Sequence, residues 1–278
     1  MTVTATTELQ GVRVSVPPQR SPRARIAWTL AGLILVVAIV PALALSMVGS
    51  AAYQPLLSRQ RVFTTPITGV TVQVSSGDLT VARDTGTATV VTTSGVQGLT
   101  YPTDTEHVVG HTLVLRSSCG TTIFNDRCTR SYVVHVPSEV AVTATSGQGD
   151  VTVTGTDSAI SVHSDQGDVT ITGGSGTVRA SSGQGGVTIS RSSASSVSAS
   201  SGQGDVVLGF VSSPTRVTAT SGQGDVTVEL PKGPHSYQVH ASSGQGNVSN
   251  NVGDDPVSHR VINATSGQGD VTVRYRSR

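Results

Sequence analysis

Short stretches in the C-terminal half of the chain alternate between apolar and polar residues. In DVTV, Val151 and Val153 point to one face of an extended strand, and the polar residues point to the other. This stretch covers residues 150–154, a second covers residues 160–163, and Gly, Ser, Thr and Asp separate the two. The pattern predicts short β-strands that are buried on one face and joined by turns.

The same unit recurs seven times at nearly constant spacing. Its copies carry an SGQGD-like motif followed by a strand, and they begin at Ala144, Val162, Ala180, Ala199, Ala219, Ala241 and Ala264. The second glycine of the motif recurs at intervals of 18, 18, 19, 20, 22 and 23 residues. These glycines are Gly149, Gly167, Gly185, Gly204, Gly224, Gly246 and Gly269. We expect a sharp turn, because glycines on either side of Gln148 can take positive φ without steric cost.

Strands of four to six residues cannot bury a face alone, so successive units are expected to stack and share one core. Stacking places like side chains above one another. The inward pairs that we predict are Val151 and Val153, Val169 and Ile171, Val187 and Ile189, Val206 and Leu208, Val226 and Val228, and Val271 and Val273. The predicted fold class is therefore all-β, a β-solenoid built from roughly 18–23-residue two-strand repeats.

Residues 62–278 form the predicted β-repeat domain, because strands and turns of the same kind also precede the seven copies. VTVQVSSGDLTVAR from Val70, HTLVLRSS from His111 and RSYVVHVPSEVAV from Arg130 alternate in the same way. In chain order, VTVRY from Val271 makes the last unit, and an uncovered last unit offers a free edge for pairing. Three nearby charges are expected to blunt that edge: Arg274, Arg276 and Arg278.

A run of 23 residues without charge, residues 26–48, precedes this domain. As a helix it would reach about 34 Å, enough to cross a hydrocarbon core of about 30 Å. Four arginines precede the run and two follow it closely, so the positive-inside rule keeps the N-terminus cytoplasmic and exports the C-terminal domain. We expect a disordered basic cytoplasmic tail at 1–25, a single-pass transmembrane signal-anchor helix in the cell membrane at 26–48, and a stalk at 49–61. A cleaved signal peptide is the alternative.

Composition and motifs narrow the class of function. Lys plus Arg number 18 against 17 Asp plus Glu, a net charge of +1, so no domain-wide field attracts nucleic acid. The seven histidines lack the HExxH spacing, no GxSxG elbow occurs, and SGQG lacks the GK[ST] ending of a phosphate loop. We therefore expect a protein that is not an enzyme, and a polysaccharide-active β-solenoid enzyme is the alternative.

The two cysteines, Cys119 and Cys128, lie in SSCGTTIFNDRC. An even pair in an exported segment predicts a disulfide. The alternative is a zinc site completed by His111 and His135, although their distance in sequence from the cysteines fits no compact zinc motif.

The repeated motif also produces two polar columns. A carboxylate follows the turn in five of the seven copies, at Asp150, Asp168, Asp205, Asp225 and Asp270. We interpret this column as turn structure that accepts hydrogen bonds from turn N–H groups. A weak calcium ladder is the alternative, because Ca²⁺ prefers oxygen-rich turns, and no other cofactor is expected. The second column consists of the glutamines of the motif. They are either soluble turn residues or an exposed row that binds a periodic glycan or cell-wall polymer: Gln148, Gln166, Gln184, Gln203, Gln223, Gln245 and Gln268.

VPSEVAVTATSGQGDVTVTG from Val136 and the recurring SGQGDVTV units resemble a widespread bacterial domain of unknown function, known as a putative adhesin with β-strand repeats. The resemblance covers roughly residues 62–278, and the family has no agreed biochemical activity. The preference for Arg over Lys and the N-terminal anchor are similar to those of an actinobacterial member. The resemblance implies a β-solenoid outside the membrane.

Together these features predict a non-catalytic, membrane-anchored cell-surface protein that acts in adhesion or contacts an envelope polymer or a surface protein. A sensing or regulatory partner in an envelope-stress system is the second hypothesis. No inference on the oligomeric state follows from the sequence.

Overall fold

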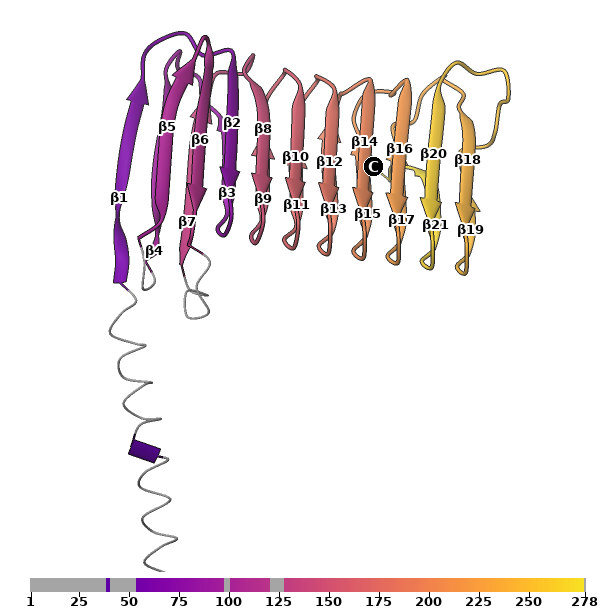
Figure 1. The fold of residues 1–278 in the computed structure, drawn as a ribbon. Helices are drawn as coiled ribbons and strands as arrows, with labels where there is room; N and C mark the ends of the chain where they lie inside the picture. Colours follow the sequence, from indigo (N-terminus) through magenta and orange to yellow (C-terminus); the bar gives the residue numbers. More distant parts are fainter. Residues whose placement is uncertain (1–38, 41–53, 98–100, 121–127, 278) are drawn as a thin grey trace, which may run out of the picture. The chain divides into compact units, whose positions relative to one another are not determined.

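The structure, a computed structural model, describes residues 39–40, 54–97, 101–120 and 128–277 (Figure 1). No helix among these residues is long and apolar enough to cross a membrane. The predicted tail at 1–25 lies outside the described residues. The predicted span at 26–48 also lies outside them, except for Ile39 and Val40, which are helical.

From residue 54 on, the described residues form two β-sheets. The first has 11 strands, in the spatial order β1 (Gln54–Phe63), β4 (Thr89–Gln97), β7 (Thr129–Val136), β3 (Leu79–Arg83), β9 (Val151–Thr154), β11 (Val169–Thr172), β13 (Val187–Ser192), β15 (Val206–Phe210), β17 (Val226–Leu230), β21 (Val271–Tyr275) and β19 (Val248–Asn250). The second has 10 strands, in the order β18 (Gln238–Ser243), β20 (Val261–Ser266), β16 (Arg216–Ser221), β14 (Ser196–Ser201), β12 (Val178–Ser182), β10 (Ile160–Ser164), β8 (Ala141–Ser146), β2 (Gly69–Val74), β6 (Thr112–Ser118) and β5 (Thr103–Val109). These strands belong to one compact unit, Ala52–Arg278.

Each coil of the stack consists of a strand of the second sheet, an SGQGD-type turn and a strand of the first sheet, as in β8 and β9 (Figure 1). Neighbouring coils pair in parallel and in register, so that Val169 lies beside Val151 on one side and Val187 on the other. The predicted all-β solenoid of two-strand repeats is confirmed. Like residues occupy the same register position in neighbouring coils, so the copies of the motif lie side by side.

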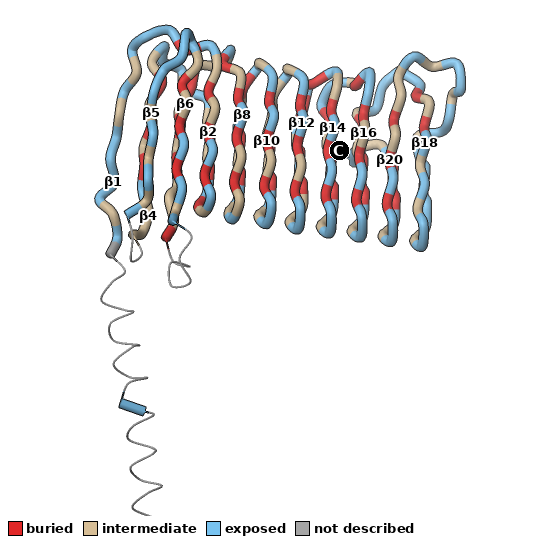
Figure 2. Tube along the Cα trace, in the orientation of Figure 1, coloured by how far each residue is buried: buried red, intermediate tan, exposed pale blue. Residues whose placement is uncertain are grey.

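The core lies between the two sheets (Figure 2). Every member of the predicted inward pairs is at most 1% exposed, which confirms the assignment from the alternating pattern. The facing strands contribute a valine, an alanine and a serine, such as Val217, Ala219 and Ser221, and all three are buried. The side chains become smaller toward the turn, because a connection of only four residues leaves little room between the sheets there.

At both ends of the stack the chain order of the coils differs from their spatial order. The coil of β20 and β21 lies between that of β16 and β17 and that of β18 and β19, and the coil of β2 and β3 likewise lies inside that of β6 and β7. The prediction that VTVRY from Val271 forms the last coil is therefore wrong, since β21 pairs with both β17 and β19. Arg274 of β21 instead forms an ion pair with Glu229 of β17, with Nε and Oε1 3.0 Å apart.

The C-terminal end of the stack is the coil of β18 and β19. Its edge is partly covered by the following loop, because the Asp254 carboxylate accepts a hydrogen bond from the N–H of Val239 at 2.9 Å. Val248 of β19 is 47% exposed, so this end still presents apolar surface.

Antiparallel strands close the opposite end, where β1 pairs with β4, β4 with β7 and β5 with β6. Residues 54–61, which we expected to belong to a stalk, form part of β1. In the described part of this strand no side chain is buried, and backbone pairing with β4 holds it in place. An edge strand of this kind lacks the alternation of buried and exposed residues by which a sequence reveals a strand.

Candidate functional site: the row of SGQGD turns

The SGQGD-type turns stack into a row along one edge of the two sheets, the lower edge in Figure 1. Strand β1 starts at the same edge. The row therefore brings each residue of the motif into a column with its counterparts from the other coils.

The serine of the motif bonds one coil to the next, and it is buried in every copy except the one with Ser243, where it is partly exposed. Ser201 Oγ donates to the carbonyl of Gly185 in the neighbouring coil (2.7 Å) and accepts from the N–H of Gly204 in its own turn (2.9 Å). Ser221 repeats both bonds, to the carbonyl of Gly204 and from the N–H of Gly224, at 2.9 Å each. The bond to the neighbouring coil recurs from Ser146, Ser164, Ser182, Ser243 and Ser266.

Close stacking, rather than backbone conformation, explains the second glycine of most turns. Of the seven predicted turn glycines, only Gly149 has a φ in the left-handed region, at 146°, so the predicted reason is wrong for the other six. A Cβ added at Gly185 would lie 2.6 Å from Asp168 Oδ1, and one added at Gly246 would lie 2.7 Å from Asp270 Oδ1. The neighbouring turn therefore occupies the space that a side chain would need.

Each carboxylate of the aspartate column accepts a hydrogen bond from the main chain of the next coil. Asp150 Oδ1 accepts from the N–H of Asp168, and Asp225 Oδ1 accepts from that of Asp270, at 2.8 Å in both cases. The N–H belongs to the next turn instead of the same turn, so the column joins coils as the serines do.

The aspartate column begins earlier than we predicted and contains one gap. Asp78 Oδ1 accepts from the N–H of Asp150 at 3.0 Å, which adds a coil to the predicted series. Gly186 offers no side chain, and no carboxylate among the described residues reaches the N–H of Asp205 at that step. At the far end Asn247 takes the place of aspartate, and its N–H donates to Asp270 Oδ1 at 2.7 Å.

Of the three polar side chains in the motif, only the glutamine makes no hydrogen bond within the described part of the chain. All seven side chains are exposed, and their amides have no hydrogen-bond partner in the described part of the chain. Serine and aspartate are committed to the neighbouring coil, whereas each glutamine amide can both donate and accept outward. The turns thus hold a row of identical amides on a rigid base.

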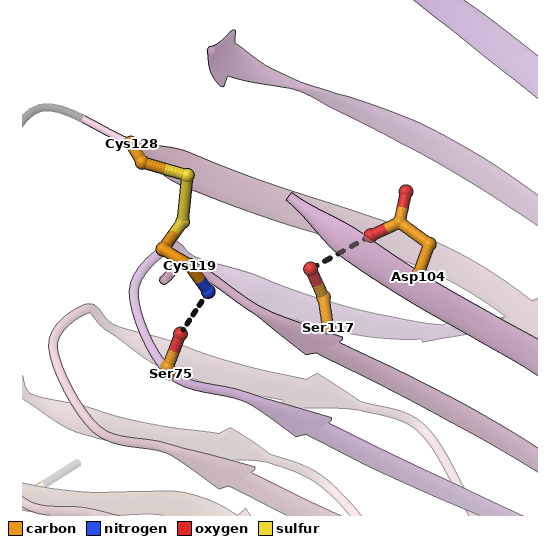
Figure 3. The surroundings of a disulfide bond; sticks show 5 residues. All are labelled: Ser75, Asp104, Ser117, Cys119 and Cys128. Atoms are coloured by element: carbon orange, nitrogen blue, oxygen red, sulfur yellow. Dashed lines mark hydrogen bonds between the residues drawn. A yellow bond between two sulfur atoms is a disulfide. The ribbon is translucent and has the colours of Figure 1, made fainter. Parts of the chain in front are cut away.

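The predicted disulfide is confirmed, because Cys119 at the end of β6 and Cys128 before β7 are bonded (Figure 3). The N–H of Cys119 donates to Ser75 Oγ at 2.9 Å, which attaches the bridge to the turn between β2 and β3. Both sulfurs are therefore unavailable to the zinc site that included His111 and His135. Across the described ranges no group of three or more His, Cys, Asp or Glu side chains could hold a metal ion.

Charged groups lie between the sheets beside this bridge. Ser117 Oγ donates to Asp104 Oδ1 at 2.7 Å (Figure 3), and Arg130 Nη2 lies 2.6 Å from Asp104 Oδ2. Burial, followed by the Asp104 carboxylate, raises the pKa of the nearby Tyr132 to about 12. The phenol therefore stays neutral to a higher pH than an exposed tyrosine does.

A family model matches the part of the chain that carries the turns. The family model described as Toastrack DUF4097 matches residues 63–277. The chain belongs to this family. The Toastrack match covers the whole row of turns and every described strand except β1, of which it includes only Phe63.

The chain is similar to solved structures, one of which, from Bacteroides fragilis, supports the fold. A putative adhesin from Bacteroides fragilis NCTC 9343 is 15% identical, with a TM-score of 0.51 over 79% of this chain and 97% of that chain. A putative adhesin from Parabacteroides distasonis ATCC 8503 is 12% identical, with a TM-score of 0.44 over 79% of this chain and 97% of that chain. No functionally curated protein matches the chain. At such identities the likeness shows the fold alone.

Sequence reasoning missed the serine column, although a signal for it exists. Ser201 follows the inward-facing Ala199 by two residues, so the period of two assigns it to the core face. A buried serine needs hydrogen-bond partners, and the adjacent glycines of this Toastrack turn supply them.

Proposed function

We propose that this Toastrack protein is a non-catalytic, single-pass membrane protein with a cytoplasmic N-terminus. Its β-solenoid lies outside the cytoplasm and binds an extended envelope polymer or a surface protein. The uncharged run at 26–48 and the arginines before it support the anchor. The Bacteroides neighbour with the same fold is named a putative adhesin, which supports a surface role.

The observation that carries the proposal is the free glutamine column. Seven exposed amides, which have no hydrogen-bond partner among the residues that the structure describes, stand one coil apart, about 4.8 Å, on turns that serine and aspartate fix in place. A polymer with regularly spaced hydroxyl and amide groups can bond to several of them at once. Because the turns are fixed beforehand, binding has to order the glutamine side chains but not the backbone that carries them.

The test is retention of the full chain, reconstituted in nanodiscs, on purified cell-envelope polymer. Replacing Gln184, Gln203 and Gln223 by alanine removes three central amides. At about 0.7 kcal/mol for each hydrogen bond, the loss is about 2 kcal/mol, or roughly 30-fold in affinity.

The matched control replaces three exposed hydroxyl residues on the outer face of the second sheet, Ser198, Ser200 and Thr220, by alanine. We expect this variant to bind as the unmodified chain does. Absence of retention of the unmodified chain, or equal affinity of the glutamine variant and the unmodified chain, would contradict the proposal.

A further inference from the structure

A hollow with unusual apolar exposure lies at the closed end of the stack. It has a volume of about 480 Å³, and its lining includes Leu57, Arg59, Tyr101 and Arg130. Leu57 is 93% exposed and Tyr101 is 74% exposed. Large apolar side chains that gather in solvent mark a contact with a partner more often than single exposed residues do.

Leu57 lies in a β-bulge of β1. Leu56 pairs with Gly95 and Arg59 pairs with Thr93, so β1 advances three residues while β4 advances two. The extra residue interrupts the ladder and re-aims the neighbouring side chain. Bulges commonly protect an edge strand, but this one presents a leucine, which indicates that something covers it.

The hollow includes residues near the start of β1, close in sequence to the predicted membrane span, and this position points to the membrane as its partner. Gln54 begins β1, and residues 49–53 separate it from the uncharged run at 26–48. Five extended residues span at most about 18 Å. If the run crosses the membrane, the start of β1 is therefore tethered close to the lipid headgroups.

The side chains that line the hollow also suit contact with lipid. Tyrosine is enriched at membrane interfaces, where its ring contacts acyl chains and its hydroxyl stays wet. Arg59 is exposed and forms no ion pair with any described residue, so it can bond to a lipid phosphate. At the far end of the stack Val257 is also exposed, at 81%, but it is far along the chain from the predicted span.

We propose that the end of the solenoid around β1 rests on an anionic lipid surface, with Leu57 and Tyr101 in the interfacial layer and Arg59 at the phosphates. This inference rests on the proposed membrane anchor.

The test uses tryptophan fluorescence of the full chain in vesicles that contain brominated lipids, which quench only indoles in contact with lipid. Trp28, the single tryptophan, lies in the predicted span and reports on the anchor. In a Trp28→Phe background, Leu57→Trp places the probe in the hollow and Val257→Trp places the matched control at the far end.

We expect brominated lipid to quench Trp28 in the unmodified chain and the probe in the Leu57→Trp variant, and to leave the Val257→Trp variant unquenched. Quenching of Trp28 without quenching in the Leu57→Trp variant would overturn this inference and leave the anchor intact. An unquenched Trp28 would overturn the anchor and, with it, the inference.

The lipid composition tests the role of Arg59. We expect quenching in the Leu57→Trp variant to be stronger in vesicles with phosphatidylglycerol than in pure phosphatidylcholine, and Arg59→Gln to remove that difference. Equal quenching in both vesicles would overturn the preference for anionic lipid.

Discussion

The serine column allows a quantitative prediction. Ser201 is 5% exposed, and alanine at this position removes its bonds to the Gly185 carbonyl and from the Gly204 N–H. Each bond contributes a net of about 0.5 to 1.5 kcal/mol. Because both glycines are partly exposed, water replaces part of the lost bonding, and we expect a loss of about 1 to 2 kcal/mol in the free energy of unfolding. For a domain of this size the melting temperature should fall by about 2 to 8 °C.

Ser200 provides the matched control, because it is the adjacent residue, is exposed, and has a side-chain hydroxyl that makes no hydrogen bond with the described residues. Ser200→Ala should change stability by less than about 0.5 kcal/mol. The measurement is thermal unfolding of the full chain in nanodiscs, followed by circular dichroism. Equal melting temperatures for Ser201→Ala and Ser200→Ala would refute the role of the serine column in joining coils.

Three further predictions concern stability. Gly186→Asn supplies an acceptor for the N–H of Asp205. Its Cβ would lie 3.3 Å from the Asp205 carbonyl oxygen, which has to shift by a few tenths of an ångström, and we expect the new hydrogen bond to outweigh this cost with a net gain of about 0.5 to 1 kcal/mol in the free energy of unfolding; an unchanged or lower melting temperature would contradict this expectation. Burial raises the pKa of Tyr132 to about 12, above the value of about 10 in the unfolded chain. The neutral phenol therefore contributes its full share of the folding stability below about pH 10, and this share is lost as the pH rises from about 10 to about 12. Tyr132→Phe should flatten this part of the curve of stability against pH. Reduction of Cys119–Cys128, which are 9 residues apart, should lower stability by about 2 to 3 kcal/mol, and a melting curve insensitive to dithiothreitol would contradict this value.

The repeated core could be predicted from the sequence because burial follows a local rule. Val151 and Val153 alternate with polar residues, and the same alternation recurs in each copy, so the inward face is fixed without knowledge of the neighbours. The stacking order could not be predicted in this way. Val271 lies in a motif that is almost the same in every copy, and such a motif carries no information on which copies become neighbours.

The candidate site was predictable in part. The glutamine column is visible in the repeat, but only the structure separates it from aspartate and serine, whose side chains bond to the neighbouring coil. The glycine requirement depends on the distance between turns, such as that between Gly185 and Asp168, which no local pattern encodes. The edge strand β1 also lacks a sequence signal, since none of its described side chains is buried and pairing with β4 holds it in place.

The free glutamine row can be observed directly by nuclear magnetic resonance of the full chain, labelled with ¹⁵N-glutamine and reconstituted in nanodiscs. Soluble fragments of envelope polymer are added, and the side-chain amide signals of the row are compared with those of Gln60 and Gln73, which lie outside it. We predict that the signals of Gln166, Gln184 and Gln203 shift together while the two reference signals stay in place. Bound fragments that leave the row unshifted, or that shift the reference signals instead, would contradict a binding role for the glutamine column.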